Sequence, residues 1–197
     1  MKKLIQYVAV LLLSLFAVAG CQSVAPETLL PIRNPGFDGP VVDQILPGWE
    51  YEEHAGQWRG HAYEVAIDAG GGPGNTDALR VTQIHDEHYS FLHQKIRVRP
   101  EDAGKTLRFS AILKTGNVGP KGWTLVMKMM GGSGIVAMVS SGGILDAFMS
   151  PPVVGTSNWN NSFVTGVIPV GTTDVDVGFS LTDYGTGWAV QPKLVIE

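Results

Sequence analysis

Residues 107–114 read Leu-Arg-Phe-Ser-Ala-Ile-Leu-Lys, and this stretch decides the fold class. Apolar and polar side chains alternate along it: Leu107, Phe109, Ala111 and Leu113 are apolar, and Arg108, Ser110 and Lys114 are polar. Successive side chains of a β-strand point to opposite faces, so a period of two predicts a strand with one buried face. We therefore expect 107–114 to lie on the core of a sheet.

The same alternation recurs at 79–83, 89–98 and 175–181. These runs are separated by turn-forming residues, among them 70–75, 116–117, 131–134 and 151–152. The chain holds 25 glycines and 12 prolines, and we find no long run with the 3.6-residue period of a helix. The pattern predicts an all-β fold, an antiparallel β-sandwich.

The N-terminus has the pattern of a secretory signal, with Lys2 and Lys3 followed by the apolar run 8–18. That run is too short to cross a bilayer core of ~30 Å, which needs about 20 residues. It ends in Val-Ala-Gly-Cys, which resembles a bacterial lipobox. The resemblance implies cleavage before Cys21 and acylation of its thiol. Gln22 in place of aspartate implies the outer membrane, facing the periplasm or the cell surface.

Three segments follow from this pattern: 1–20 as signal peptide, 21–33 as a lipidated tether, and 34–197 as one domain. The net charge is −4, and removal of Lys2 and Lys3 would make the mature chain more acidic. Nucleic-acid binding needs a basic surface, so we expect no such partner. Cys21 is the only cysteine, so the domain folds without a disulfide.

Several motifs in order resemble the jelly-roll carbohydrate-binding modules of the galactose-binding-like superfamily. They are Asn-Pro-Gly-Phe-Asp at 34–38, Pro-Gly-Trp at 47–49, Asp-Ala-Leu-Arg-Val at 77–81, and the strands 94–100 and 105–115. The likeness covers nearly all of 34–197. It implies a jelly-roll β-sandwich that binds a poly- or oligosaccharide without transforming it, and it places Trp49, Trp159 and Trp188 in the core.

One departure from that family concerns calcium. The family commonly carries an aspartate in its last strand that helps hold a structural ion, whereas residues 188–194 here contain Lys193 and no carboxylate. Asp38 and Asp43 could still contribute ligands. We predict no cofactor, with a structural calcium as the alternative.

Sugar rings stack on aromatic side chains, and polar groups fix their hydroxyls. Tyr89 and Phe91 lie on the strand face opposite Leu92, Ile96 and Val98, and a tryptophan lies on a glycine-flanked loop. The predicted ligand-binding residues are Trp58, Tyr89, Phe91, His93, Arg97 and Arg108. Their positive charges suit an acidic glycan. The alternative is that a loop covers the two rings and the cations form an ordinary solvated face.

Residues 85–88, His-Asp-Glu-His, with His93 downstream, form the densest set of possible metal ligands. They lack the helical His-Glu-x-x-His spacing of metalloproteases, so we predict a polar hairpin loop and no metal site. The alternative is adventitious binding of zinc or nickel by two histidines three residues apart on a turn. No Gly-x-Ser-x-Gly elbow is present, and no catalytic residue is predicted. The predicted function is a lipid-anchored, non-catalytic glycan-binding protein.

Two other functions stay open. One is a structural or assembly lipoprotein that docks onto an envelope protein. The other is a polysaccharide lyase, because Gln83-Ile84-His85 resembles a strand of jelly-roll alginate lyases. A lyase also needs a group that moves the C5 proton, and that tripeptide alone does not supply one.

The lipobox prediction is tested by Cys21→Ser. Because the thiol is the only acylation site that the lipobox provides, the variant should take up no palmitate analogue in metabolic labelling, whereas the unchanged chain should be labelled. Equal labelling of the two chains would contradict the assignment.

Overall fold

The computed structural model describes residues 27–54, 60–132 and 143–197. Apart from two short 3-10 turns, the regular structure is all strand, which confirms the all-β prediction: β1 (Thr28–Leu30), β2 (Glu50–Glu53), β3 (Tyr63–Asp68), β4 (Ala78–Gln83), β5 (Ser90–Arg97), β6 (Thr106–Gly131), β7 (Ile144–Met149), β8 (Val153–Val167), β9 (Thr172–Leu181) and β10 (Thr186–Ile196). In these ranges no helix has the length and apolar character needed to span a membrane.

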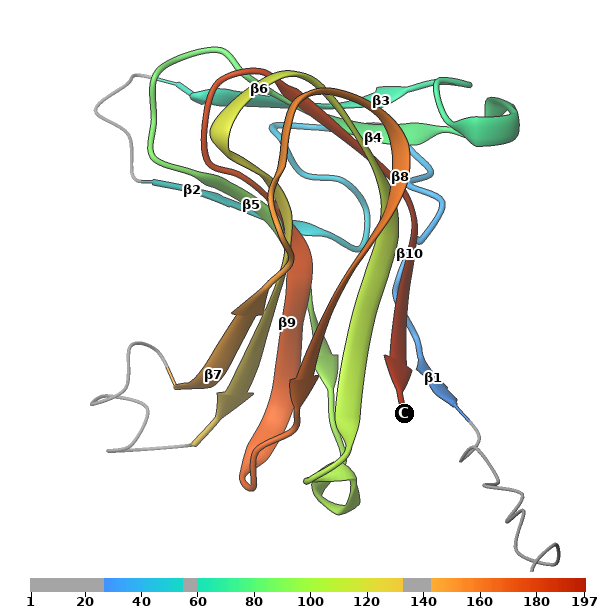
Figure 1. Cartoon of the computed structure of the whole chain (residues 1–197), viewed down its shortest axis with the longest axis vertical. Helices are drawn as coiled ribbons and strands as arrows, with labels where there is room; N and C mark the ends of the chain where they lie inside the picture. Colours follow the sequence, from blue (N-terminus) through green and yellow to red (C-terminus); the bar gives the residue numbers. More distant parts are fainter. Residues whose placement is uncertain (1–26, 55–59, 133–142) are drawn as a thin grey trace, which may run out of the picture.

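Strand β6 builds both layers of the sandwich. Its first half, 106–118, pairs with β8 and β10, and its second half, 123–131, pairs with β9 and β7 and meets β8 only at Trp123. Figure 1 shows β6 rising along one layer, bending at the top and descending in the other. All the pairings are antiparallel, in the order β2-β5-β9-β6-β10-β4-β3.

We call β8, the first half of β6, β10, β4 and β3 the β8 layer. The β5 layer consists of β2, β5, β9, the second half of β6 and β7. The apolar side chains of 107–114 face inward as predicted: Leu107, Phe109, Ala111 and Leu113 are all buried. The second half of β6 keeps the same odd-numbered inward face, with Trp123, Leu125, Met127 and Met129 buried.

The centre of the core is an aromatic cluster around Phe179 of β9. Its ring centroid lies 5.8 Å from that of Phe109, 5.7 Å from Trp123, 5.6 Å from Trp49 and 6.0 Å from Phe37. Phe109 and Trp123 come from the two halves of β6, so the cluster joins the layers. The assignment of Trp49 to the core is confirmed.

The folded domain begins earlier than the sequence predicts. Residues 28–30, assigned to the tether, form β1 and pair with β10 in the register Thr28↔Ile196 to Leu30↔Leu194. Farther on, the buried Gln94 side chain binds the backbone of Arg33 twice, accepting from its N–H at 2.8 Å and donating to its carbonyl at 3.1 Å. The proline-bearing, mostly uncharged composition of 22–33 therefore hid a strand that is defined by its pairing with β10.

Phe109→Ala tests the core. Removing a fully buried aromatic ring leaves a cavity, so unfolding free energy should fall by about 3–5 kcal/mol. The matched control is Phe163→Ala, which makes the same chemical change at a ring that is 51% exposed. That change should cost on the order of 1 kcal/mol. Urea unfolding followed by circular dichroism measures both, and equal losses would contradict the assigned core.

Candidate functional site

The predicted residues on β5 lie on the outer face of the β5 layer, opposite Leu92 and Ile96 as the alternation indicated. However, Phe91 is only 2% exposed and His93 only 3%. Their rings stack at 4.5 Å, and the Lys128 ammonium lies 4.2 Å from the Phe91 centroid. The expectation of an open platform at these two residues is therefore wrong, because neighbouring side chains cover them.

His93 is held by a carboxylate on the adjacent strand. Its Nδ1 bonds to Asp176 Oδ1 of β9, and Glu52 Oε1 of β2 lies 3.6 Å from Nε2. Gly178 makes this packing possible, since a Cβ there would lie 2.7 Å from the His93 Cβ. Buried charges need partners, and the Asp176–His93 pair meets that need within the sheet. The arrangement locks β2, β5 and β9 together.

The remaining predicted residues are scattered. Tyr89 precedes β5 and is 38% exposed, and the Arg97 side chain is 82% exposed and 3.9 Å from Asp174. Arg108 lies in the other layer, so the predicted grouping with Tyr89 and Arg97 is wrong. Strand β9 separates β5 from β6, and the half of β6 that carries Arg108 belongs to the β8 layer. Trp58 and Cys21 lie outside the described residues.

The outer face of the β8 layer carries a row of two indoles and a lysine that we call the indole row: Trp159 of β8, Lys114 of β6 and Trp188 of β10. The Lys114 ammonium lies 5.7 Å from the Trp159 centroid and 4.7 Å from the Trp188 centroid. Both tryptophans are half-buried. Their predicted place in the core is therefore wrong, and solvent reaches both rings.

Trp188 is fixed from three sides. Its Nε1–H donates to Asp68 Oδ2 of β3 at 3.1 Å. Its ring lies over Gly116, where a Cβ would approach to 3.2 Å. Behind it, the Trp123 indole in the core donates to the Trp188 carbonyl at 3.1 Å. The orientation of the Trp188 indole is therefore fixed by the fold itself.

The same face is hollowed further along the strands. A cavity of about 390 Å³ is lined by residues that include Arg108, Ser110, Asn161, Phe163 and Gln191. The Arg108 guanidinium lies 4.3 Å from the Phe163 centroid. A second hollow of about 530 Å³ adjoins it along β8, at 151–154 and 160–163. The face thus combines exposed aromatic rings with amide, hydroxyl and cationic groups, which is the chemistry that sugars require.

A local signal for this face was present in the sequence. Trp188 stands between Gly187 and Ala189, and both of these small residues are buried. Strict alternation would have sent Trp188 outward with Lys114 and Arg108. The core position that the family resemblance implies for Trp188 conflicts with this alternation, and the structure follows the alternation.

Comparison with known protein families and with curated proteins finds no match. Solved structures do match in fold. A “putative sugar binding protein” from Bacteroides thetaiotaomicron aligns with TM-score 0.57 and 12% identity, over 85% of this chain and 100% of that one. A structure described as CBM4 aligns with TM-score 0.53 and 17% identity, over the same shares.

The fold is the jelly roll of carbohydrate-binding modules. A third structure, the tailspike protein 4 enzymatically active domain of bacteriophage CBA120, aligns with TM-score 0.56 and 10% identity. That alignment covers 76% of this chain and 19% of the tailspike chain, so this chain spans about a fifth of that protein. The predicted jelly-roll fold is confirmed.

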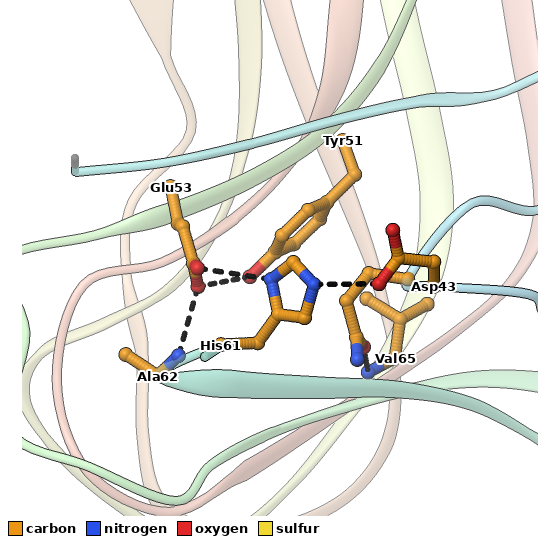
Figure 2. A network of polar contacts seen from close by, with 7 residues as sticks. Asp43, Tyr51, Glu53, His61, Ala62 and Val65 are labelled. Atoms are coloured by element: carbon orange, nitrogen blue, oxygen red, sulfur yellow. Dashed lines mark hydrogen bonds and ion pairs between the residues drawn. The ribbon is translucent and has the colours of Figure 1, made fainter. Parts of the chain in front are cut away.

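A separate polar network lies at the end of β2 (Figure 2). His61 is placed between two carboxylates: its Nε2 is 3.0 Å from Asp43 Oδ1 and its Nδ1 is 3.0 Å from Glu53 Oε1. The other Glu53 oxygen accepts from the Tyr51 hydroxyl at 2.8 Å and from the Ala62 N–H at 3.0 Å. The groups satisfy one another, so this network acts as a structural link.

The network fixes a strained turn. Asp43 and Gln44 both have positive φ, 52° and 64°, in the hairpin closed by Val42 and Ile45. Gln44 Oε1 accepts from the Val65 N–H at 2.6 Å, and Asp43 binds His61. Asp43 was one of the two carboxylates considered for calcium, and in this structure it pairs with His61. The hydrogen bond to Asp43 is the largest influence and raises the pKa of His61 above its usual 6.5; desolvation opposes this increase, and the hydrogen bond to Glu53 adds to it.

This pKa shift predicts a pH-dependent contribution to stability. A group whose folded pKa is raised stabilises fully below its unfolded pKa, about 6.5, and loses that effect as pH rises through the folded pKa. The difference in melting temperature between the unchanged chain and His61→Gln should therefore be larger at pH 6 than at pH 9. A constant difference, or one that grows with pH, would contradict the ion-pair assignment.

Proposed function

We propose that the chain binds a glycan on the outer face of the β8 layer and does not transform it. The observation that carries the proposal is the indole row, in which two half-buried tryptophans, one of them the fixed Trp188, flank a lysine. Sugar C–H faces stack on such rings, and preorganised rings bind at a smaller entropic cost. Lys114 and Arg108 on the same face favour a glycan with carboxylate or sulfate groups.

The fold comparisons support this proposal. The structures described as CBM4 and as a “putative sugar binding protein” are aligned over their full length. The proposed face is built from β6, β8 and β10, and the inner faces of β6 and β10 carry buried core side chains, so a ligand would rest on a rigid surface. The aromatic and amide groups on this face can bind and orient a sugar, and we propose no reaction there.

Lipid anchoring through Cys21 belongs to the same proposal and rests on the lipobox alone. An acylated Cys21 would hold the domain at the bacterial outer membrane, facing the periplasm or the surface. The start of β1 at Thr28 leaves only a few residues between the anchor and the fold. The domain would therefore stand close to the membrane.

A second candidate function is docking onto an envelope protein. Within the described ranges β8 pairs with β6 alone, so its other edge is unpaired. Val154, Phe163 and Val167 of this strand are exposed. An exposed strand edge with apolar side chains can accept a strand from a partner. Binding of a protein partner, and not of sugar, would favour this alternative.

Trp159→Ala and Trp188→Ala test the proposed face. After a glycan array has identified a ligand for the unchanged chain, each variant should weaken binding at least ~10-fold, which is about 1.4 kcal/mol. The reason is that each indole would supply a stacking surface. Isothermal titration measures the affinities, and thermal unfolding confirms that the variants fold.

The matched control is Tyr89→Ala, which removes an exposed ring that lies outside this face. It should leave affinity unchanged. The opposite result, with Tyr89→Ala weakening binding and Trp159→Ala having no effect, would move the site away from the β8 layer and contradict the proposal. Affinity should also fall with added salt if Lys114 and Arg108 contact an acidic glycan.

A further inference from the structure

The end of β2 brings a third ligand to the histidine-rich segment before β5. The His54 N–H donates to the Tyr89 carbonyl at 3.2 Å, which extends the β2–β5 ladder by one step. As a result His54 lies beside Glu87 and His88. One ligand atom from each of these three residues can be chosen so that all three lie within 4.8 Å of one another. The spacing within 85–88 could not indicate His54 as a third ligand, because His54 lies far from that segment in the sequence.

We propose that His54, Glu87 and His88 bind a single Zn²⁺ ion. Two imidazoles and one carboxylate are a recurrent zinc ligand set, with water completing a four-coordinate shell. Imidazole nitrogen is a poor ligand for Ca²⁺ and Mg²⁺, which prefer oxygen. The chemistry of this ligand set therefore selects a transition metal over Ca²⁺ or Mg²⁺.

The distances suit an ion after a small movement. His54 Nδ1 lies 2.8 Å from Glu87 Oε1, and the His54 and His88 ring centroids are 4.8 Å apart. Tetrahedral ligands at 2.0–2.2 Å from zinc stand about 3.4 Å from each other. His54 and His88 are both exposed, so their rings can rotate by the required fraction of an ångström. The ion would replace the proton that now joins His54 to Glu87.

The backbone around Glu87 is already fixed, which distinguishes this cluster from a chance surface group. The Glu87 carbonyl accepts from the buried Tyr63 hydroxyl at 2.9 Å and from Gln83 Nε2 at 3.0 Å. The Glu87 carboxylate accepts from the His88 N–H at 2.7 Å. A carboxylate has further lone pairs available for a metal.

The test is zinc binding by the full-length chain, purified without a polyhistidine tag. Competition with a chromogenic chelator should show one Zn²⁺ per chain. His54→Ala, His88→Ala and Glu87→Gln should each weaken binding at least 10-fold, because each removes one of three ligands. The matched control is His85→Ala, which removes an exposed histidine of the same segment that is not in the cluster and should leave affinity unchanged.

Zinc should also raise the melting temperature of the unchanged chain, since a ligand of the folded state stabilises it. The same zinc concentration should not raise that of His54→Ala, whose far-ultraviolet circular dichroism shows whether it folds. His88→Asn provides a second variant with a polar side chain. No uptake of zinc by the unchanged chain would overturn the proposal. So would undiminished binding by folded His54→Ala and His88→Asn.

Discussion

The structure depends on the packing of rings around Phe179. Phe109 and Trp123 approach it from the two halves of β6, and Trp49 and Phe37 approach it from the N-terminal segment. A strand as long as β6 can serve two layers only if both of its halves are held to a common centre. No disulfide is available for that purpose, because Cys21 is the only cysteine. Buried aromatic area therefore supplies the cross-link between the layers.

The same cluster positions the proposed glycan face. Trp123 stacks on Phe179 with 16° between the ring planes and presses against Gly187, where a Cβ would lie 2.4 Å from an indole carbon. Its Nε1–H then holds the carbonyl of Trp188. The side chain of Trp188, which follows Gly187 along β10, consequently emerges on the outer face in a fixed position. A core contact on one side of the sheet thus sets the position of the ring on the other.

The sequence predicted the parts of the fold that depend on local alternation. The inward face of 107–113 follows directly from the period of two, and so does the opposition of Phe91 to Leu92. It could not predict which strands are neighbours, because β9 and β10 come late in the chain and insert beside β5 and β6. For that reason Arg108 was grouped with the wrong layer. Exposure also escaped prediction, since Phe91 and Trp188 both alternate outward and only Trp188 is reached by solvent.

The edge strand β2 is held to its neighbours by polar side-chain contacts. Its four residues bury little apolar surface, yet its last two residues and the adjoining His54 each face a histidine or a carboxylate of another segment. Glu52 faces His93, Glu53 binds His61, and His54 binds Glu87. Acidic side chains on a short edge strand also discourage pairing with other chains. The attachment of β2 therefore rests on polar side-chain contacts in addition to its pairing with β5, whereas the indole row in the β8 layer rests on aromatic packing. Conditions that loosen β2 should leave the proposed glycan face in place.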